Sequence, residues 1–390
     1  MIALRHIGRL FTSAERGVIE DAAIVFDGAI RWVGRDRDLP RGDAEELDAA
    51  GALVTPGFID AHTHPVYPSP RLDEVAARAR GTSYVDIAES GGGIAATVAA
   101  TRASDADELA TVVEERIARW AESGTTTVEA KTGYHLTRDG ELAAVEILSS
   151  LAERDDLPRI EVTFLGAHAV PPGVSRSEHV DAVVSWCVEA GSAGARFCDV
   201  FCDDGYFTVD EARRILSAGR AARLAPRIHA DELARTGGAL LAAELDAASA
   251  DHLLRITPED AAALGRAGVT ATLAPVTALA MGTIPPVEAL RSNSVTIALG
   301  SDHNPGTSGL TDMTIVVALA VAELGLSVEE AVTAATRGGA LSLLRRDLGV
   351  IEVGATADIV LWDADHEGAF AWQWGVAPVA VWREGRGLSF

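Results

Sequence analysis

The stretch Phe58–Val66 reads FIDAHTHPV, and it guides both the fold and the chemistry that we expect of this chain. Residues two apart on a strand point to the same face, so His62 and His64 would present two imidazole rings side by side. Neutral imidazole is a common ligand of zinc and of iron-type ions. An isolated pair of this kind is more often a solvated surface turn, so the rest of the chain has to decide.

The run that ends at His62 is the first of eight apolar, β-branched runs that end in polar residues. Segments of helical length, rich in Ala, Glu and Arg, lie between most of them, for example 104–123, 139–153 and 208–223. Strands that alternate with helices predict a parallel sheet, and eight of them predict an α/β fold of the (β/α)8, TIM-type barrel class. The eight runs are 57–62, 125–130, 160–168, 195–201, 225–231, 246–252, 268–275 and 295–302.

The two ends of the chain differ from this pattern. Residues 1–54 contain short alternating strands and an Asp27-Gly28 turn, and the last segment of the chain has the same style. We therefore expect a small β-sandwich built from residues 1–54 and 351–390, with the barrel over residues 55–350. Two independent β domains are the alternative, but each end alone offers few strands.

The composition limits the kinds of partner and the cellular compartment that we expect for this protein. With 390 residues and 48% hydrophobic residues the chain can bury a large core, and its net charge of −24 argues against a nucleic-acid or anionic-membrane partner. The N-terminus has no continuous apolar segment of the signal-peptide kind, and TIVVALAVAELGL is too short to span a bilayer. Three cysteines indicate a reducing compartment without a disulfide framework, so we expect a cytoplasmic protein. They are Cys187, Cys198 and Cys202.

Polar side chains follow the expected strands where barrel enzymes place their catalytic groups, at the C-terminal ends. Half of the ten histidines fall there, together with Glu129, Lys131, Glu232 and Asp302. One metal ion is the simplest interpretation, because a nitrogen and carboxylate set without thiolate suits zinc or non-haem iron. Such an ion lowers the pKa of a bound water from 15.7 to about 7. The expected ligands are His62, His64, His229 and Asp302.

Three neighbours of these ligands need separate interpretations. Glu232 follows His229 at i+3 and could face the same site, although a surface carboxylate at a helix start is the alternative. His252 could donate a hydrogen bond to the attacked oxygen or hold the attacking water, and a satisfied core histidine is the alternative. Lys131 could carry a carbamate between two ions, but a single ligand set favours one ion and a structural or supporting lysine.

Stretches from about Pro56 to Gly306 resemble the amidohydrolase superfamily. Within it they are similar to the imidazolonepropionase family, which opens 4-imidazolone-5-propanoate to N-formimino-L-glutamate in histidine degradation. The segment GVIEVGATADIVLWD near the C-terminus is similar to the closing strands of the superfamily, so the resemblance covers nearly the whole chain. The stretches that carry it are PGFIDAHTH, RARGTSYVDI with GGGI, TTTVEAKTGY, TFLGAHAVP, DVFCDDGYFT, IHADE, SADHLL and SDHNPG.

The resemblance implies one zinc or iron ion per chain, divalent or trivalent, on the four ligands already named, and a homodimer. It implies catalytic roles for Glu232, His252 and Asp302. A clamp of Arg71 and Tyr134 with His168 could bind the propanoate group, although a loop ion pair for Arg71 and packing for Tyr134 are the alternatives. The implied substrate contacts are Arg71, Tyr134, His168, Glu232, Asn304, Gly306 and Thr307.

Three positions depart from the family pattern and border the expected carboxylate pocket. The loop HTHPVYPSPR lacks the usual glycines, His135 stands where the family tends to have glycine, and Gly306-Thr307 replaces a common Gly-Ser. Two other functions therefore stay open. One is a related amidohydrolase or deaminase that acts on another small nitrogen heterocycle, and the other is a barrel that serves as a non-catalytic binding scaffold.

Overall fold

Eight parallel strands form the barrel in the order in which they occur in the chain. The computed structural model describes residues 1–82, 86–87 and 90–389, so Ser83–Val85 of the RARGTSYVDI motif lie outside the described residues. Each of the eight runs expected from the sequence overlaps one strand, and nearly every strand residue is buried, as is usual when helices cover a parallel sheet. The strands are β6 (Phe58–Thr63), β7 (Thr125–Lys131), β8 (Arg159–Ala167), β9 (Phe197–Cys202), β10 (Ala225–Ala230), β11 (Ser249–His252), β12 (Thr270–Leu273) and β13 (Ile297–Leu299).

The barrel closes where the segment after β13 meets the end of β6. Thr63 and His303 form a parallel bridge, and the amide of His64 donates to the carbonyl of His303 at 2.7 Å. The buried carboxylate of Asp60 fastens the same seam, because it accepts from the Ser301 amide at 2.9 Å and from Trp120 Nε1 at 2.8 Å. The ends of the first and last barrel strands are thereby held side by side.

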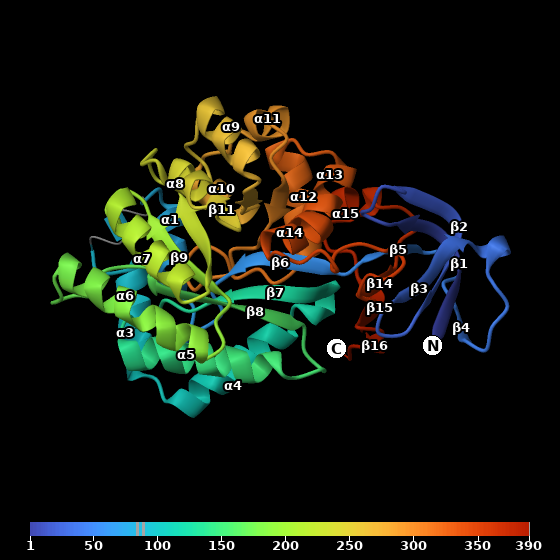
Figure 1. Ribbon diagram of the computed structural model, residues 1–390, viewed down its shortest axis with the longest axis horizontal. Coiled ribbons are helices and arrows are strands. Elements are labelled where there is room, and N and C mark those ends of the chain that lie inside the picture. Colours follow the sequence, from blue (N-terminus) through green and yellow to red (C-terminus); the bar gives the residue numbers. More distant parts are fainter. Residues whose placement is uncertain (83–85, 88–89, 390) are drawn as a thin grey trace.

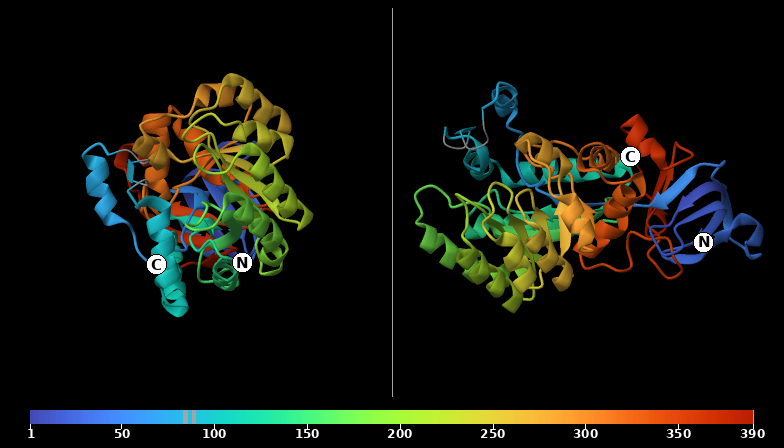
Figure 2. Two further views of the ribbon diagram at one scale, coloured as in Figure 1. Left: turned by 90° about the vertical axis from the view of Figure 1, so that its left-hand side faces the viewer. Right: turned by 90° about the horizontal axis from the view of Figure 1, so that it is seen from above.

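Helices surround the strands and cover the outer face of the barrel (Figures 1 and 2). The helical segments expected from the sequence are confirmed, and four helices begin with a reciprocal capping box, as at Thr208 and Glu211 of α7. No helix in the described ranges is long and apolar enough to cross a membrane. The helices are α1 (Leu72–Ala79), α3 (Gly93–Ala103), α4 (Ala106–Ala118), α5 (Arg138–Ala152), α6 (Arg176–Ser192), α7 (Val209–Ala221), α8 (Gly238–Glu244), α9 (Pro258–Ala267), α10 (Pro275–Met281), α11 (Val287–Ser292), α12 (Met313–Leu324), α13 (Val328–Thr333), α14 (Gly339–Ser342) and α15 (Gly368–Gln373).

Both chain ends contribute strands to a second, mixed sheet in the order β16-β15-β14-β5-β1-β2-β3, with β4 paired to β1. The ends meet where β14 pairs antiparallel with β5, directly before β6 enters the barrel. The predicted fold class, a barrel with a β domain from both ends, is confirmed, whereas the exact bounds of the two domains stay a prediction. The strands are β1 (Ile2–Phe11), β2 (Val18–Phe26), β3 (Ile30–Arg35), β4 (Glu45–Asp48), β5 (Leu53–Pro56), β14 (Ile359–Trp362), β15 (Pro378–Arg383) and β16 (Arg386–Gly387).

Gly124 fixes the contact between the barrel and this β domain. It precedes β7 with φ of 77°, and a Cβ at this position would lie 2.4 Å from the ring of Trp362, which is fully buried and donates from Nε1 to Thr55 Oγ1 at 2.9 Å. We expect Gly124→Ala to lower the free energy of unfolding by about 1–3 kcal/mol, measured by denaturant titration, because the indole has no free space to move into. Gly173→Ala is the control, since Gly173 has φ of 82° with no atom within 4 Å. Equal losses for the two variants would contradict this account.

Candidate active site and metal centre

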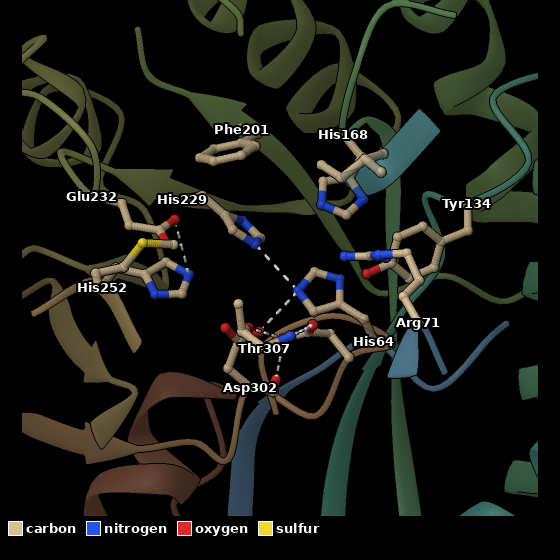
Figure 3. A pocket seen from close by; sticks show the side chains of 13 residues that line it. His64, Arg71, Tyr134, His168, Phe201, His229, Glu232, His252, Asp302 and Thr307 are labelled. Atoms are coloured by element: carbon tan, nitrogen blue, oxygen red, sulfur yellow. Dashed lines mark hydrogen bonds and ion pairs between the residues drawn. The ribbon is translucent and has the colours of Figure 1, made fainter. Parts of the chain in front are cut away.

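A cavity opens at the C-terminal ends of the barrel strands (Figure 3). It holds nearly all of the site residues expected from the sequence, with His62 just beneath His64 and Gly306 beside Arg71. Three apolar residues of its wall, Ile94, Phe201 and Met281, could not be predicted from the sequence, because apolar residues of these types are equally common in a hydrophobic core. The lining residues are His64, Arg71, Ile94, Tyr134, His168, Phe201, His229, Glu232, His252, Met281, Asp302, Asn304 and Thr307.

Three imidazole rings converge at the floor of this cavity. His64 Nε2 lies 3.1 Å from His62 Nε2 and 3.4 Å from His229 Nε2. Asp302 Oδ1 lies 3.5 Å from His62 Nε2 and 3.4 Å from His64 Nε2. All four side chains are buried. These four residues are the ones that the sequence predicts as metal ligands.

The donor set fits a metal ion. Ligands at about 2.0–2.1 Å from a tetrahedral zinc stand roughly 3.3 Å apart, close to the separations seen here. The nitrogen lone pairs of neutral imidazoles repel one another at such distances unless a cation lies between them. His252 also has a ring nitrogen within 4.8 Å of ligand atoms of His62 and His229, so it is a near neighbour of the same centre. The protein therefore has a buried histidine and aspartate metal site.

Two carboxylates behind the ring cluster orient the histidines. His62 Nδ1 lies 2.7 Å from Asp251 Oδ2, and His229 Nδ1 lies 3.1 Å from Asp199 Oδ2. Burial opposes the charge on Asp251, but Arg227 and Lys131 outweigh it and lower the pKa of Asp251 to about 2. An ionised carboxylate only accepts, so each Nδ1 carries the proton and each Nε2 is left with a lone pair for the ion.

Burial keeps His62 and His229 neutral. It lowers the pKa of His62 well below the usual value for histidine, with the charge of Lys131 adding to the effect, and it lowers the pKa of His229 to about 4. Neutral rings are the form that binds metal. These two predicted ligands are thus in the protonation state that the metal requires at neutral pH.

Backbone strain collects at the ends of the strands that carry these groups. Four residues that are not glycine adopt left-handed conformations there: Asp231 with φ of 52°, His252 with φ of 71°, Leu253 with φ of 59° and Asp302 with φ of 47°. Such conformations are costly for residues with a Cβ and occur mainly where function requires them. Asp302 is held in this geometry by Thr277, whose hydroxyl donates to Oδ2 and leaves Oδ1 facing the histidines. Nothing in the sequence around Thr277 indicated this contact.

Glu232 and His252 stand together beside the ligand cluster. Glu232 Oε2 lies 3.7 Å from His252 Nε2, and both side chains are buried. Burial raises the pKa of Glu232 to about 7, and the neighbouring charges of Asp302 and Asp203 act in the same direction. A carboxyl group with this pKa can donate or accept a proton near neutral pH, as acid–base chemistry requires.

Asp203 positions Glu232. Its Oδ2 accepts from the amides of Glu232 at 2.6 Å and Leu233 at 2.9 Å, and its Oδ1 accepts from the amide of Ala234 at 3.0 Å. We expect Asp203→Asn to lower kcat/KM by about tenfold, because a carboxamide has one acceptor oxygen and its NH2 group would face amide donors. Steady-state kinetics of the purified variant measure this. Asp204→Asn is the matched control, since Asp204 is exposed, and identical kinetics for the two variants would contradict the role of Asp203.

The opposite wall of the cavity carries a cation and a phenol. Arg71 donates from Nε to Glu74 Oε1 at 2.9 Å and from Nη1 to Thr97 Oγ1, and a Cβ on Gly306 would fall 1.9 Å from Arg71 Nη2. Glycine at position 306 thus leaves the space that the guanidinium occupies. Tyr134 is buried, which raises the pKa of its phenol well above the usual value, so the hydroxyl remains a donor.

His168 and Asn304 complete this side of the cavity. His168 Nδ1 lies 3.1 Å from the Gly133 carbonyl, which can only accept, so Nδ1 donates and Nε2 is an acceptor. Asn304 uses its side chain within its own loop, accepting from the amides of Gly306 and Thr307, both at 2.8 Å. These hydrogen bonds of Asn304 hold the loop in shape. The contact from Asn304 to the substrate stays a prediction.

His135, whose role the sequence left open, is absent from the lining of this cavity. Its Nδ1 bonds Thr137 Oγ1 at 2.8 Å, and its ring covers Gly140 of α5, where a Cβ would fall 1.9 Å from His135 Cγ. The three cysteines are free and buried, as expected.

Known proteins share both the sequence and the fold of this chain. Residues 220–386 match the model of the amidohydrolase family. An imidazolonepropionase from Streptomyces griseus is 42% identical, covering 98% of each chain, and one from Mycolicibacterium smegmatis is 42% identical, covering 97% of this chain and 95% of the relative.

Solved structures with low sequence identity support the fold alone. An atrazine chlorohydrolase mutant from Arthrobacter aurescens, complexed with zinc and atraton, is 20% identical with a TM-score of 0.75, covering 99% of this chain and 95% of the other. An adenosine deaminase from Xanthomonas campestris with bound zinc is 19% identical with a TM-score of 0.75, covering 99% and 92%. From its identity to the curated relatives over nearly its whole length, together with the buried metal site, the chain belongs to the imidazolonepropionase family of amidohydrolase enzymes.

Proposed function

We propose that this protein hydrolyses 4-imidazolone-5-propanoate to N-formimino-L-glutamate. The observation that carries the proposal is one cavity with a cluster of metal ligands at its floor and Arg71 in its wall. A ring amide beside the ligands and a carboxylate beside the guanidinium would use both features. The name shared by relatives about 40% identical supports the same substrate.

A zinc or iron ion held by His62, His64, His229 and Asp302 would supply a water of lowered pKa and polarise the ring carbonyl. In our proposal Arg71 and Tyr134 bind the propanoate carboxylate, and His168 accepts a hydrogen bond from the substrate. This contact set fixes the ring over the ligand cluster and excludes water from the cavity wall.

The remaining side chains transfer protons and stabilise the negative charge that develops on the carbonyl oxygen. Water adds to the ring carbonyl carbon, and Asp302 accepts the proton that the water loses. His252 donates a hydrogen bond to the carbonyl oxygen as negative charge develops on it. Asp302 then passes the proton to the ring nitrogen while the C–N bond breaks, and Glu232 holds a ring N–H. The oxygen of the water and one of its hydrogens end in a carboxylic acid, and the other hydrogen ends on the ring nitrogen. The acid then loses its proton to solvent, so the product has one new carboxylate and one new N–H.

The direct test is to incubate the metal-replete protein with imidazolonepropanoate. We expect the substrate absorbance to fall faster than in buffer and formiminoglutamate to accumulate, as seen by mass spectrometry. Protein stripped of metal by a chelator is the control and should leave the buffer rate unchanged. Decay at the buffer rate with metal-replete protein would refute the assignment.

Two further features follow from the family resemblance, and we propose them on that ground. They are a homodimer and a cytoplasmic location. Light scattering coupled to gel filtration tests the first, and a monomer mass would contradict it.

A further inference from the structure

Five charged side chains are packed behind the ligand histidines, and all are fully buried. Lys131 stands at their centre at the end of β7. Its Nζ lies 2.9 Å from Glu129 Oε1, 2.8 Å from Asp199 Oδ2 and 3.5 Å from Asp251 Oδ2. The group consists of Glu129, Lys131, Asp199, Arg227 and Asp251, and we refer to it as the buried charge cluster.

Two members of the cluster are the carboxylates that orient the ligand histidines. Asp251 contacts His62 Nδ1 at 2.7 Å, and Asp199 contacts His229 Nδ1 at 3.1 Å. Lys131 therefore forms ion pairs with both carboxylates, and through them it reaches two of the four expected metal ligands, on strands β6 and β10. Arg227 also holds one of them: its Nη2 donates to Asp251 Oδ2 at 3.3 Å, so Asp251 has two cationic partners, whereas Lys131 is the cation that contacts both carboxylates.

The surroundings of Lys131 exclude the carbamate bridge that the sequence left open. An ammonium has three N–H donors, and all three have carboxylates in reach. A carbamate would place a fourth negative group among three buried carboxylates, which is strongly unfavourable in a medium of low polarity. The lysine is held as a cation.

We propose that Lys131 is a positioning residue of the metal centre: it clamps Asp199 and Asp251 so that His62 and His229 keep Nδ1 protonated and aim Nε2 at the ion. This inference rests on the proposed ligand set. The competing interpretation is that Lys131 merely balances charge in the interior. The two interpretations predict different results for a variant that lacks Lys131 but has the same net charge in the buried charge cluster as the wild type. Such a variant should hold the metal less well if Lys131 is a positioning residue, and equally well if Lys131 only balances charge.

Glu129 allows the two interpretations to be separated. It belongs to the buried charge cluster, but no described hydrogen bond or ion pair joins its side chain to His62 or His229. The wild-type cluster carries three negative and two positive charges. Lys131→Met makes the net charge more negative, from −1 to −2, and the double variant Lys131→Met with Glu129→Gln returns it to −1 with Asp199 and Asp251 still in place. Glu129→Gln alone keeps the clamp and is the matched control.

The measurement is the rate at which each zinc-loaded protein loses zinc to a chromophoric chelator, with circular dichroism to follow the fold. We expect zinc to leave the single and double Lys131 variants about 10–100 times faster than the wild type, the usual range when a partner of a ligand is removed. Glu129→Gln should stay close to the wild type.

A folded double variant that keeps zinc as long as the wild type would overturn the proposal. So would failure of both Lys131 variants to fold, since Lys131 would then be a structural residue. The assay uses no substrate, so the proposed function is tested separately. A wild type that holds zinc but leaves imidazolonepropanoate intact would refute that function and leave the role of Lys131 standing.

Discussion

Replacing Asp302 by asparagine is expected to lower kcat on imidazolonepropanoate by about 10²–10⁴-fold, the range for loss of a positioned acid–base group. Asparagine matches aspartate in size, and its amide oxygen can still accept from Thr277. It lacks the negative charge and cannot take the proton from water or return it to the ring nitrogen. KM should change far less, because in our proposal Arg71 and Tyr134 bind the far end of the substrate.

Zinc content is measured on the same preparation, since an amide is a weaker ligand than a carboxylate. A variant that holds zinc and has lost kcat separates proton transfer from metal binding. Asp365→Asn is the control, because Asp365 is exposed in the β domain. A kcat for Asp302→Asn within twofold of the wild type would contradict the role given to this residue.

Replacing Arg71 by glutamine is expected to raise KM for imidazolonepropanoate by about 10–150-fold, as expected for the loss of a charge-assisted hydrogen bond worth about 1.5–3 kcal/mol. Arg71 is held toward the cavity by Glu74 and Thr97, so its guanidinium is preorganised for a carboxylate. Steady-state kinetics with the acid and with its methyl ester measure the effect. The loss should be large for the acid and small for the ester.

The matched control is Arg80→Gln. Arg71 directly precedes helix α1, whereas Arg80 directly follows it and is exposed. Equal losses on acid and ester would mean that Arg71 supports the loop rather than the carboxylate. No loss on either would favour the alternative of an uncharged heterocycle as the substrate.

The sequence was most informative where one local pattern determines the outcome. Every barrel strand was found because an apolar, β-branched run before a polar end is specific to buried parallel strands. The same rule located His229 and Asp302, which lie at strand ends and come together through the parallel order of the sheet.

Contacts that depend on register between strands could not be predicted. Asp203 follows β9 but holds the backbone after β10, and Thr277 on α10 reaches Asp302 after β13. Lys131 was noted at a strand end, yet its two aspartate partners lie on β9 and β11, and no sequence spacing indicates that they meet. These residues act through others, so their types alone carry no functional signal.

The central claim is that one ion lies among His62, His64, His229 and Asp302. Anomalous diffraction at the zinc edge, from crystals of the zinc-loaded protein, tests it most directly. We predict one anomalous peak per chain, within bonding distance of Nε2 of all three histidines and of the Asp302 carboxylate. A peak bound elsewhere, or no peak between these four side chains, would contradict the account.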